Sequence, residues 1–151
     1  MAHSVIILSF EDLTNYDLYA VLKLRSEVFV VEQNCVYSDL DDKDQRSLHL
    51  LMKEKGKLIG YARILPPGLS YDYPSIGRVV IHPEQRGRKL AHGLMTSCIN
   101  FIYQEYDSKK IIISAQSYLK KFYTGLGFVQ SGEEYLEDGI PHVKMIYTHG
   151  N

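Results

Sequence analysis

A basic, glycine-containing stretch between an apolar run and a long helix is the part of this sequence best suited to chemistry. It reads Arg86-Gly87-Arg88-Lys89-Leu90-Ala91, and it follows a β-branched run that ends at His82-Pro83. Proline removes an N–H donor, so the chain must leave a sheet there. Apolar residues then recur at helical spacing, at Leu90, Leu94, Cys98 and Ile102. A helix that begins in positive charge and unpaired amides suits a pyrophosphate, so the sequence predicts an anion site.

The elements that must position this turn follow from the periodicity of the rest of the chain. Helices are expected from Thr14, as N-cap, to about residue 31, over 88–106, and over 118–126 with Gly127 as C-terminal cap. The polar segments 34–47 and 133–141 are expected to be loops, the first with the alternative of a broken helix. This order predicts a mixed α/β (α+β) domain. Its strands are expected over 5–10, 49–55, 57–65, 76–81, 110–115, 128–131 and 142–147.

Composition limits what else the chain can be. Its 151 residues predict a single domain spanning 1–151, since a domain of this size buries roughly 70% of its unfolded surface. A net charge of −1 argues against nucleic-acid or membrane partners and leaves the basic cluster local. The two cysteines, Cys35 and Cys98, are far apart, and the apolar run at 5–8 is too short for a signal peptide or a membrane span. We therefore expect a reducing, cytoplasmic location.

Several motifs taken together resemble the GCN5-related N-acetyltransferases (GNAT), over about 120 residues from Leu22 onward. The order is strand, basic turn, helix and apolar strand, followed by Phe122-Tyr123 and Gly127-Phe128. In that family the turn reads Arg or Gln, two residues, Gly, one residue, then Gly or Ala; here Arg86 and Ala91 fit, and Lys89 replaces the central glycine. A closer resemblance, to the ElaA-type branch, rests on the stretches 24–33, 61–65, 76–79, 115–116, 122–123 and 137–142.

The resemblance implies a fold, an activity and a set of contacts. The fold is a mostly antiparallel sheet of six to seven strands flanked by about four helices. The activity is transfer of an acetyl group from acetyl-CoA to a primary amine of a small molecule or peptide, directly in a ternary complex, by a monomer or homodimer without a metal. The residues expected to bind CoA are Val79, Val80, Ile81, Arg86, Gly87, Arg88, Lys89, Leu90, Ala91, Gln116 and Phe122.

The same resemblance assigns Tyr123 as the general acid that protonates the leaving sulfur. The assignment is chemically reasonable, because a phenol of pKa about 10 stays protonated at neutral pH and can donate to a thiolate whose conjugate acid has a pKa of about 8.5. The alternative is an ordinary buried tyrosine, one of twelve in the chain.

A base is also needed, because only about one alkylamine molecule in 2,500 is neutral at pH 7, a penalty near 4.6 kcal/mol. The candidates are Glu32, His49, Glu133 and His142, and the branch motifs favour Glu32 and His142. Each histidine has the alternative of a structural role, and each glutamate that of a solvated surface group. The residues expected to anchor the acceptor are Arg25, Phe29, Arg63 and Arg78.

Other functions remain open. The acidic stretch 39–44 does not fit an EF-hand, which needs Gly and Glu where Asp44 and Leu50 stand. We interpret it first as a solvated face and second as an attractor for a cationic amine. The six histidines show no zinc spacing. The alternatives to an N-acetyltransferase are a non-catalytic acyl-CoA sensor and, from the spacing of Arg25, Phe29, Asp41 and Asp44, an enzyme similar to acyl-homoserine-lactone synthases.

Overall fold

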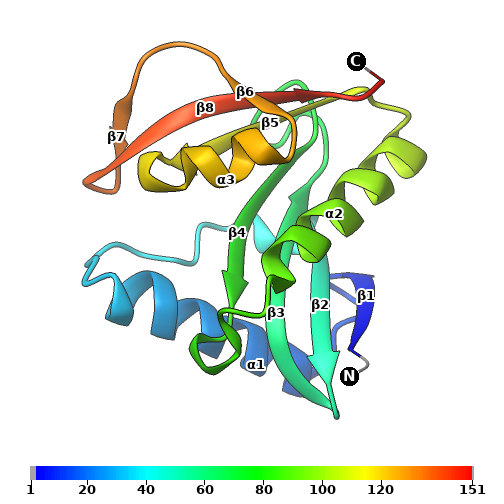
Figure 1. Cartoon of the computed structure of the whole chain (residues 1–151). Helices are drawn as coiled ribbons and strands as arrows, with labels where there is room; N and C mark the ends of the chain where they lie inside the picture. The colour runs from blue at the N-terminus through cyan, green and yellow to red at the C-terminus, as the bar shows by residue number, and fades with distance from the viewer. Residues whose placement is uncertain (1–2, 151) are drawn as a thin grey trace.

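The computed structural model describes residues 3–150 and distributes their strands between two antiparallel sheets (Figure 1). The first sheet has the order β1-β2-β3-β4, and the second has the order β5-β8-β6 with β7 also paired to β8. The mixed α+β fold is thus confirmed, with eight strands in two sheets where one sheet of six to seven was expected. The strands are β1 (Ser4–Ser9), β2 (Leu48–Glu54), β3 (Lys57–Leu65), β4 (Ser75–Ile81), β5 (Lys110–Gln116), β6 (Phe128–Gln130), β7 (Tyr135–Glu137) and β8 (Ile140–Thr148).

The helices begin close to where their capping signals predict. The side chain of Thr14 accepts a 3.0 Å hydrogen bond from the amide of Asp17, which makes Thr14 the N-cap of the first helix. This helix continues beyond its last α-helical residue as a π-helix. The α-helices are α1 (Asn15–Arg25), α2 (Leu90–Tyr106) and α3 (Lys120–Gly125); the shorter or wider helices are η1 (Ser26–Glu32, the π-helix), η2 (Asp44–Arg46), η3 (Pro83–Gln85) and η4 (Ser117–Leu119).

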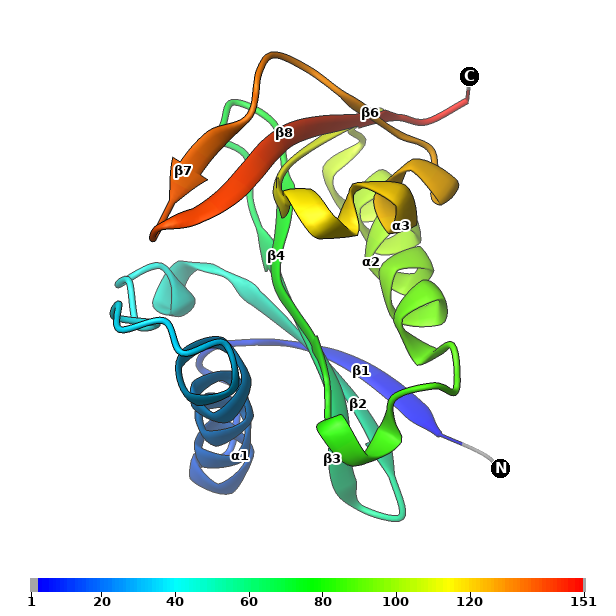
Figure 2. The same ribbon diagram turned by 60° about the vertical axis from the view of Figure 1, so that its left-hand side comes forward.

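Two helices cover opposite faces of the first sheet, α1 on one side and α2 on the other (Figure 2). Successive residues of a strand point to opposite faces, so Leu50 packs in the cluster with α2, whereas Leu51 packs in the cluster with α1. The α2 residues at helical spacing, among them Leu94 and Ile102, are completely buried in that first cluster. The sheet is therefore held between two apolar layers.

One strand, β7, lies in a segment that the sequence predicted to be a loop. Its three residues are all exposed, so they carry no hydrophobic alternation that could indicate a strand. The turn Asp138-Gly139 has positive φ at both positions, 53° and 75°, which is the geometry of a two-residue hairpin. This hairpin aligns β7 against the start of β8, with Tyr135 opposite His142.

No helix within residues 3–150 has both the length and the apolar character needed to cross a bilayer.

Candidate active site

The two sheets separate between β4 and β5 and leave a wedge-shaped cavity. The strands meet at one end, where the amide of Ile112 donates a 3.1 Å hydrogen bond to the carbonyl oxygen of Pro74. From there they diverge (Figure 1), and no described strand pairs with the edge of β4 that faces away from β3. The cavity has a volume of about 1020 Å³, and its walls include 75–81 of β4 and 113–116 of β5. An unpaired strand edge offers amides and carbonyls to an extended ligand.

A β-bulge interrupts β4 in the middle of this wall. Tyr61 pairs with Val80 and Arg63 pairs with Gly77, so two steps along β3 correspond to three along β4. Arg78 lies within this bulge, and its φ of 51° is unusual for a residue with a side chain. The bulge re-aims the Arg78 side chain toward the loop after η1, where its Nη2 donates to the carbonyl oxygen of Asp39 at 2.8 Å.

The π-helix η1 forms the facing wall. Its wider turn is visible in the hydrogen bonds from the amide of Gln33 to Val28 and from that of Cys35 to Val30, each five residues back. The wide turn directs Phe29, Glu32 and Gln33 into the cavity lining together with Val28. Gln33 reaches across it, because its Oε1 accepts a 3.3 Å hydrogen bond from Nε2 of Gln116 on β5. The other side-chain atom of Gln116, Oε1, is buried without a partner in the described residues.

The basic turn predicted as an anion site has the backbone that such a site needs. None of the four amides from Arg86 to Lys89 donates a hydrogen bond to any residue within 3–150. Gly87 and Lys89 both adopt positive φ, 85° and 60°, and Lys89 directly precedes the first residue of α2. Residues with left-handed backbone angles that alternate with residues of negative φ direct successive N–H groups toward one concave side of the chain. The turn can therefore receive an anion through its backbone.

The side chains of the turn are less available than its backbone. Arg86 makes a two-bonded pair with Glu32, at 2.6 and 2.8 Å, and Arg88 pairs with Glu54 on β2 at 2.8 Å. These are exposed ion pairs, which stabilise little and can exchange partners. Arg86 and Ala91 line the cavity, whereas the predicted residues Gly87, Arg88, Lys89 and Leu90 do not. Leu90 instead packs in the core beneath α2, so only its backbone can face a ligand.

Tyr123, the residue that the family resemblance assigns as proton donor, belongs to the cavity lining. It comes from α3, is 7% exposed and lines the cavity together with Phe122, whose ring meets it edge-on at 5.1 Å. Burial raises the pKa of the Tyr123 phenol to about 12, with smaller contributions from Tyr118 and Cys98. No hydrogen bond ties its hydroxyl to another side chain of residues 3–150, so its proton can be donated to a ligand.

The acidic stretch 39–44 is not the solvated face that the sequence favoured. Asp39, Asp41 and Asp44 form an ion-pair network with three arginines that come from α1, β3 and β4. Arg25 contacts Asp39 at 2.7 Å and Asp44 at 2.8 Å. Arg63 binds both oxygens of Asp41 at 2.7 Å and also Asp44 at 2.9 Å, and Arg78 lies 2.7 Å from Asp39. Three positive and three negative charges balance, so the network is neutral.

This network corrects the interpretation of Arg25 as an acceptor anchor. Arg25 is completely buried and does not line the cavity, and its Nε and Nη1 donate to Asp39 and Asp44. Phe29, Arg63 and Arg78 do line the cavity. Burial by itself raises the pKa of Asp41, but its hydrogen bonds and charge contact with Arg63 outweigh this, so the pKa lies far below the usual range. Asp41 therefore stays ionised, and its ion pair with Arg63 holds the loop after η1 against the sheet.

The four base candidates occupy very different places. His49 is buried away from the cavity, with Nδ1 2.6 Å from the hydroxyl of Tyr61 and Nε2 2.9 Å from the carbonyl oxygen of Asp44. Glu133 is exposed and is not part of the lining. Glu32 lines the cavity, but its pair with Arg86 lowers its pKa and makes it a weaker base. His142 lines the cavity from the start of β8 and is 6% exposed.

Sequence reasoning missed a polar group around His142. Ser114 Oγ lies 2.8 Å from Glu137 Oε1 and 2.5 Å from the hydroxyl of Tyr135, and Glu137 Oε2 lies 3.7 Å from His142 Nε2. The sequence did contain a signal for this arrangement, because the dipeptide Asp138-Gly139 is typical of a two-residue hairpin turn. Two-residue alternation from that turn places Tyr135, Glu137 and His142 on one face.

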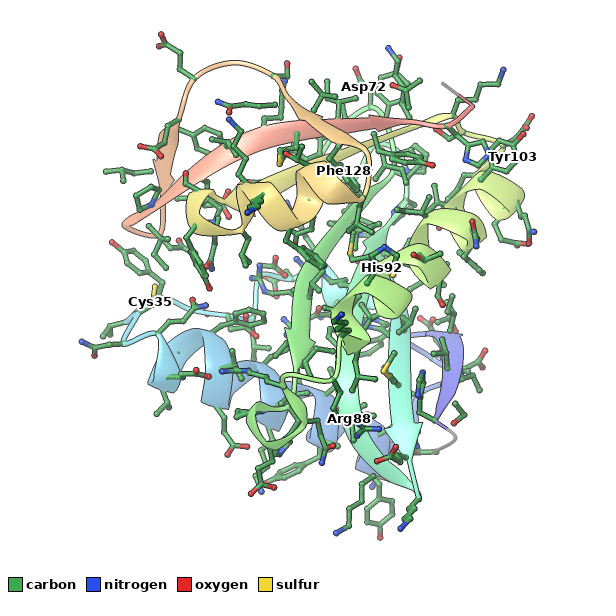
Figure 3. All side chains as sticks on the ribbon, viewed as in Figure 1. Cys35, Asp72, Arg88, His92, Tyr103 and Phe128 are labelled. Carbon is green, nitrogen blue, oxygen red and sulfur yellow. The ribbon has the colours of Figure 1, made fainter. Side chains whose placement is uncertain are left out.

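The loop after η1 and the β7–β8 hairpin meet at the mouth of the cavity. Cys35 Sγ lies 3.4 Å from the carbonyl oxygen of Asp138, and the Tyr37 ring packs beside Gly139. Figure 3 shows the Cys35 side chain in this position, between the loop and the hairpin. Within the described residues, no group of three or more His, Cys, Asp or Glu is arranged to hold a metal ion.

Comparison with known proteins places this geometry in a family. The model of the acetyltransferase (GNAT) domain matches residues 13–149. Protein ElaA of Escherichia coli is 39% identical over 140 residues, which cover 91% of this chain and 92% of that protein, and its crystal structure superposes with a TM-score of 0.90. The chain belongs to the GNAT acetyltransferase family, in its ElaA-type branch.

Two further solved structures show how far the fold extends. An acyl-CoA N-acyltransferase from Pseudomonas aeruginosa is 38% identical and superposes with a TM-score of 0.92, covering 97% of this chain and all of that one. The acyl-homoserine-lactone synthase LasI reaches a TM-score of 0.80 at 18% identity, covering 97% and 90% of the two chains. At that identity the likeness concerns the fold alone. The family resemblance and the mixed fold inferred from the sequence are therefore confirmed.

Proposed function

We propose that this protein transfers an acetyl group from acetyl-CoA to a primary amine of a small molecule or peptide, by direct transfer in a ternary complex. The observation that carries the proposal is that one cavity is lined by the free edge of β4, by Tyr123 and by both ends of the basic turn, Arg86 and Ala91. The four amides of that turn at 86–89 are unpaired within residues 3–150. Membership of the acetyltransferase family supports the acyl-transfer class.

The residues present fit a CoA thioester. A pyrophosphate suits the amides of the basic turn, where Arg86 and Arg88 can exchange their glutamate partners for phosphate oxygens. An extended pantetheine arm suits the edge of β4 between Gly77 and Ile81. On the wall opposite β4, the unpartnered Oε1 of Gln116 can accept a hydrogen bond from an amide N–H of the pantetheine arm. When bound, CoA supplies the acetyl group as a thioester, whose C–S bond is replaced by an amide C–N bond.

The roles of the protein's own groups follow from their positions. Tyr123 donates its phenolic proton to the departing sulfur, and its raised pKa keeps that proton in place throughout the neutral range. His142 faces the cavity from the other side and serves as the base on the acceptor side. Phe122 and Phe128 pack edge-on against the Tyr123 ring and hold its orientation.

The test combines turnover with cofactor binding. Acetyl-CoA and a panel of primary amines are incubated with the protein, free thiol is measured, and CoA affinity is determined by calorimetry. Replacing Tyr123 by Phe should lower kcat by about 10²- to 10³-fold, because a positioned acid contributes on that order. The CoA Kd should stay within two-fold, since the ring contacts are kept.

A matched control is Tyr118→Phe, which removes a hydroxyl from another tyrosine that lines the same cavity but is 72% exposed. This variant should keep its kcat. If Tyr123→Phe turns over at the wild-type rate, the acid assignment is wrong. If CoA binds and no amine is acetylated, the chain is the non-catalytic sensor of the alternative hypothesis.

A further inference from the structure

A hydrogen-bond chain holds the Glu137 carboxylate in one orientation at the acceptor side of the cavity. Ser114 Oγ donates to Glu137 Oε1 at 2.8 Å. A serine hydroxyl has a single proton, so the Tyr135 hydroxyl, 2.5 Å from Ser114 Oγ, must be the donor to Ser114. The chain therefore runs from Tyr135 through Ser114 to Oε1 and leaves Oε2 of Glu137 free to face His142.

The tautomer of His142 follows from its other neighbour. Its Nδ1 lies 2.7 Å from the carbonyl oxygen of Ile140, which can only accept, so Nδ1 carries a proton. In the neutral imidazole, Nε2 is then a lone-pair acceptor. It lies 3.7 Å from Glu137 Oε2, which is too far for a hydrogen bond. When His142 is neutral, two acceptors therefore face each other across this gap.

The Glu137 carboxylate is the negative charge at this gap. The arginines that line the cavity nearby, Arg63 and Arg78, are already balanced by Asp39 and Asp41. Tyr71, Tyr135 and Ser114 lie beside this pair. Two lysines belong to the same region: Lys43, whose Nζ donates to Ser70 Oγ at 2.8 Å, and Lys144, which stands opposite Ser114 in the β5–β8 register. The Glu137 side chain is 46% exposed, so a ligand can reach it. Within residues 3–150, no lysine or arginine pairs with it.

We infer that Glu137 and His142 together bind the nitrogen of the acceptor as a primary ammonium ion, between Glu137 Oε2 and His142 Nε2, and that Glu137 is a residue of the acceptor site. This inference rests on the proposed acyl transfer and names its substrate class. An ammonium nitrogen about 2.9 Å from each acceptor closes a triangle on the 3.7 Å gap, with one N–H directed to each atom. The phenol rings of Tyr71 and Tyr135 add an aromatic surrounding that favours a cation.

The proton inventory of the step balances. One of the three ammonium protons passes to His142 Nε2 and from there to solvent, and Glu137 stabilises the imidazolium that forms. The neutral amine then forms the C–N bond as the C–S bond breaks. Tyr123 gives its proton to the sulfur and recovers one through solvent from the nitrogen, and the last proton stays on the amide. The sum is an amide, free CoA thiol and one proton released.

The site also selects among amines. A carboxylate on the carbon next to the nitrogen would lie against Glu137 and Asp138, and like charges at that distance repel. Alcohols have one proton and can satisfy only one of the two acceptors. The acceptor class is therefore a primary amine without an adjacent carboxylate, so 2-phenylethylamine should be acetylated at least ten times more efficiently than L-phenylalanine.

The kinetic experiment separates binding from proton removal with 2-phenylethylamine as the probe. Glu137→Gln should raise the amine KM at least ten-fold, and His142→Asn should lower kcat about 100-fold with a smaller change in KM. Both variants should bind CoA within two-fold of the wild type in calorimetry, which shows that they are folded. The matched control is Glu134→Gln, an exposed neighbour outside the cavity lining, which should keep both constants.

A second readout does not depend on turnover. In ¹⁵N NMR spectra of the CoA-bound protein, neutral His142 should be the Nδ1–H tautomer, and its Nε2 resonance should move on addition of 2-phenylethylammonium. The shift should vanish in Glu137→Gln. The inference would be overturned by unchanged kinetic constants in both variants or by equally efficient acetylation of L-phenylalanine. It would also be overturned if the Nε2 resonance did not shift on addition of the ammonium. If the wild type acetylates no amine, the proposed function fails, and the NMR measurement still decides whether this pair binds an ammonium ion.

Discussion

Lys89 shows how a single backbone angle can account for a family's preference at one position. It stands where the GNAT turn has glycine, and its φ of 60° lies in the left-handed region. A side chain in that region costs roughly 1–2 kcal/mol, which glycine does not incur. The amide that the turn needs is the same for both residues. The replacement therefore affects stability more than the geometry of the anion site.

Replacing Lys89 by Gly should raise the free energy of unfolding by about 1 kcal/mol, because relief of the left-handed strain exceeds the extra freedom of glycine in the unfolded chain. Urea denaturation measures this. Lys89→Ala removes the same charge and keeps the strain, so it should show no gain. If both variants gain equally, the charge of Lys89 and not its backbone angle is responsible.

Charge contacts at single residues also distinguish the two glutamates that line the cavity. Glu32 is held by Arg86, which lowers its pKa, whereas Glu137 is held by a neutral hydroxyl and keeps an oxygen free. From the sequence, Glu32 was favoured as a base and Glu137 was assigned no role, although Glu137 begins the branch motif 137–142. The identity of the partner decides the chemistry of a carboxylate, and the partner is supplied by the fold.

At the scale of elements, the loop after η1 is held by ion pairs and not by an apolar contact with the sheet. Asp41 accepts two hydrogen bonds from Arg63, whose side chain is 4% exposed. Removing one partner of a buried charge leaves the other without full compensation. This loop forms one wall of the cavity and contacts the β7–β8 hairpin, so its anchoring positions the acceptor side.

The anchoring predicts a specific dependence of stability on pH. Because the folded pKa of Asp41 is lowered, its contribution is fully present above the unfolded value of about 3.9 and is lost as pH falls through the folded pKa. Asp41→Asn should therefore lower the free energy of unfolding by about 2 kcal/mol at pH 7. The difference from wild type should persist at pH 5 and shrink progressively below pH 4.

Urea denaturation at pH 7, 5, 4 and 3 measures this difference. Asp42→Asn makes the same chemical change at an exposed neighbour in the same loop and should differ little from wild type at any pH. A constant gap between Asp41→Asn and wild type down to pH 3 would show that the pKa of Asp41 is the same in the folded and unfolded chains, which contradicts the lowered folded pKa.

In the molecule as a whole, the two sheets approach each other where the amide of Ile112 on β5 donates to the carbonyl oxygen of Pro74, just before β4, and the two strands do not pair beyond it. A ligand that pairs with the edge of β4 completes the contact between the sheets. It should therefore stabilise the molecule as a unit, by about 2.7 kcal/mol at a CoA concentration of 100 times its Kd.

Hydrogen exchange with CoA and with a fragment of it tests this arrangement. CoA should slow exchange at the turn 86–91 and at amides of β4 between 77 and 81. Adenosine 3′,5′-bisphosphate lacks the pantetheine arm and should slow exchange at the turn alone. Protection of β4 by the fragment, or none by CoA, would contradict the pairing of the arm with this strand.

Most of the helices and strands, and two short motifs of the candidate site, could be predicted from the order of the residues alone. The helices of α1 and α2, the β2–β3 hairpin and the apolar β5 could be predicted because periodicity and capping act over a few residues. The turn 86–91 could be predicted as an anion site because its residues are consecutive in the sequence, and the family resemblance predicted the role of Tyr123 from the short motif around it.

The partners of the charged groups could not be predicted from the sequence and depend on the folded arrangement. Arg25 and Asp44 are 19 residues apart, and Arg86 and Glu32 are 54 apart, so no local pattern could pair them. The β7 strand, the β4 bulge and the separation of the sheets likewise depend on contacts between distant segments. Whether an acidic side chain is solvated, anchors a loop or receives a substrate depends on which distant residue the fold brings beside it.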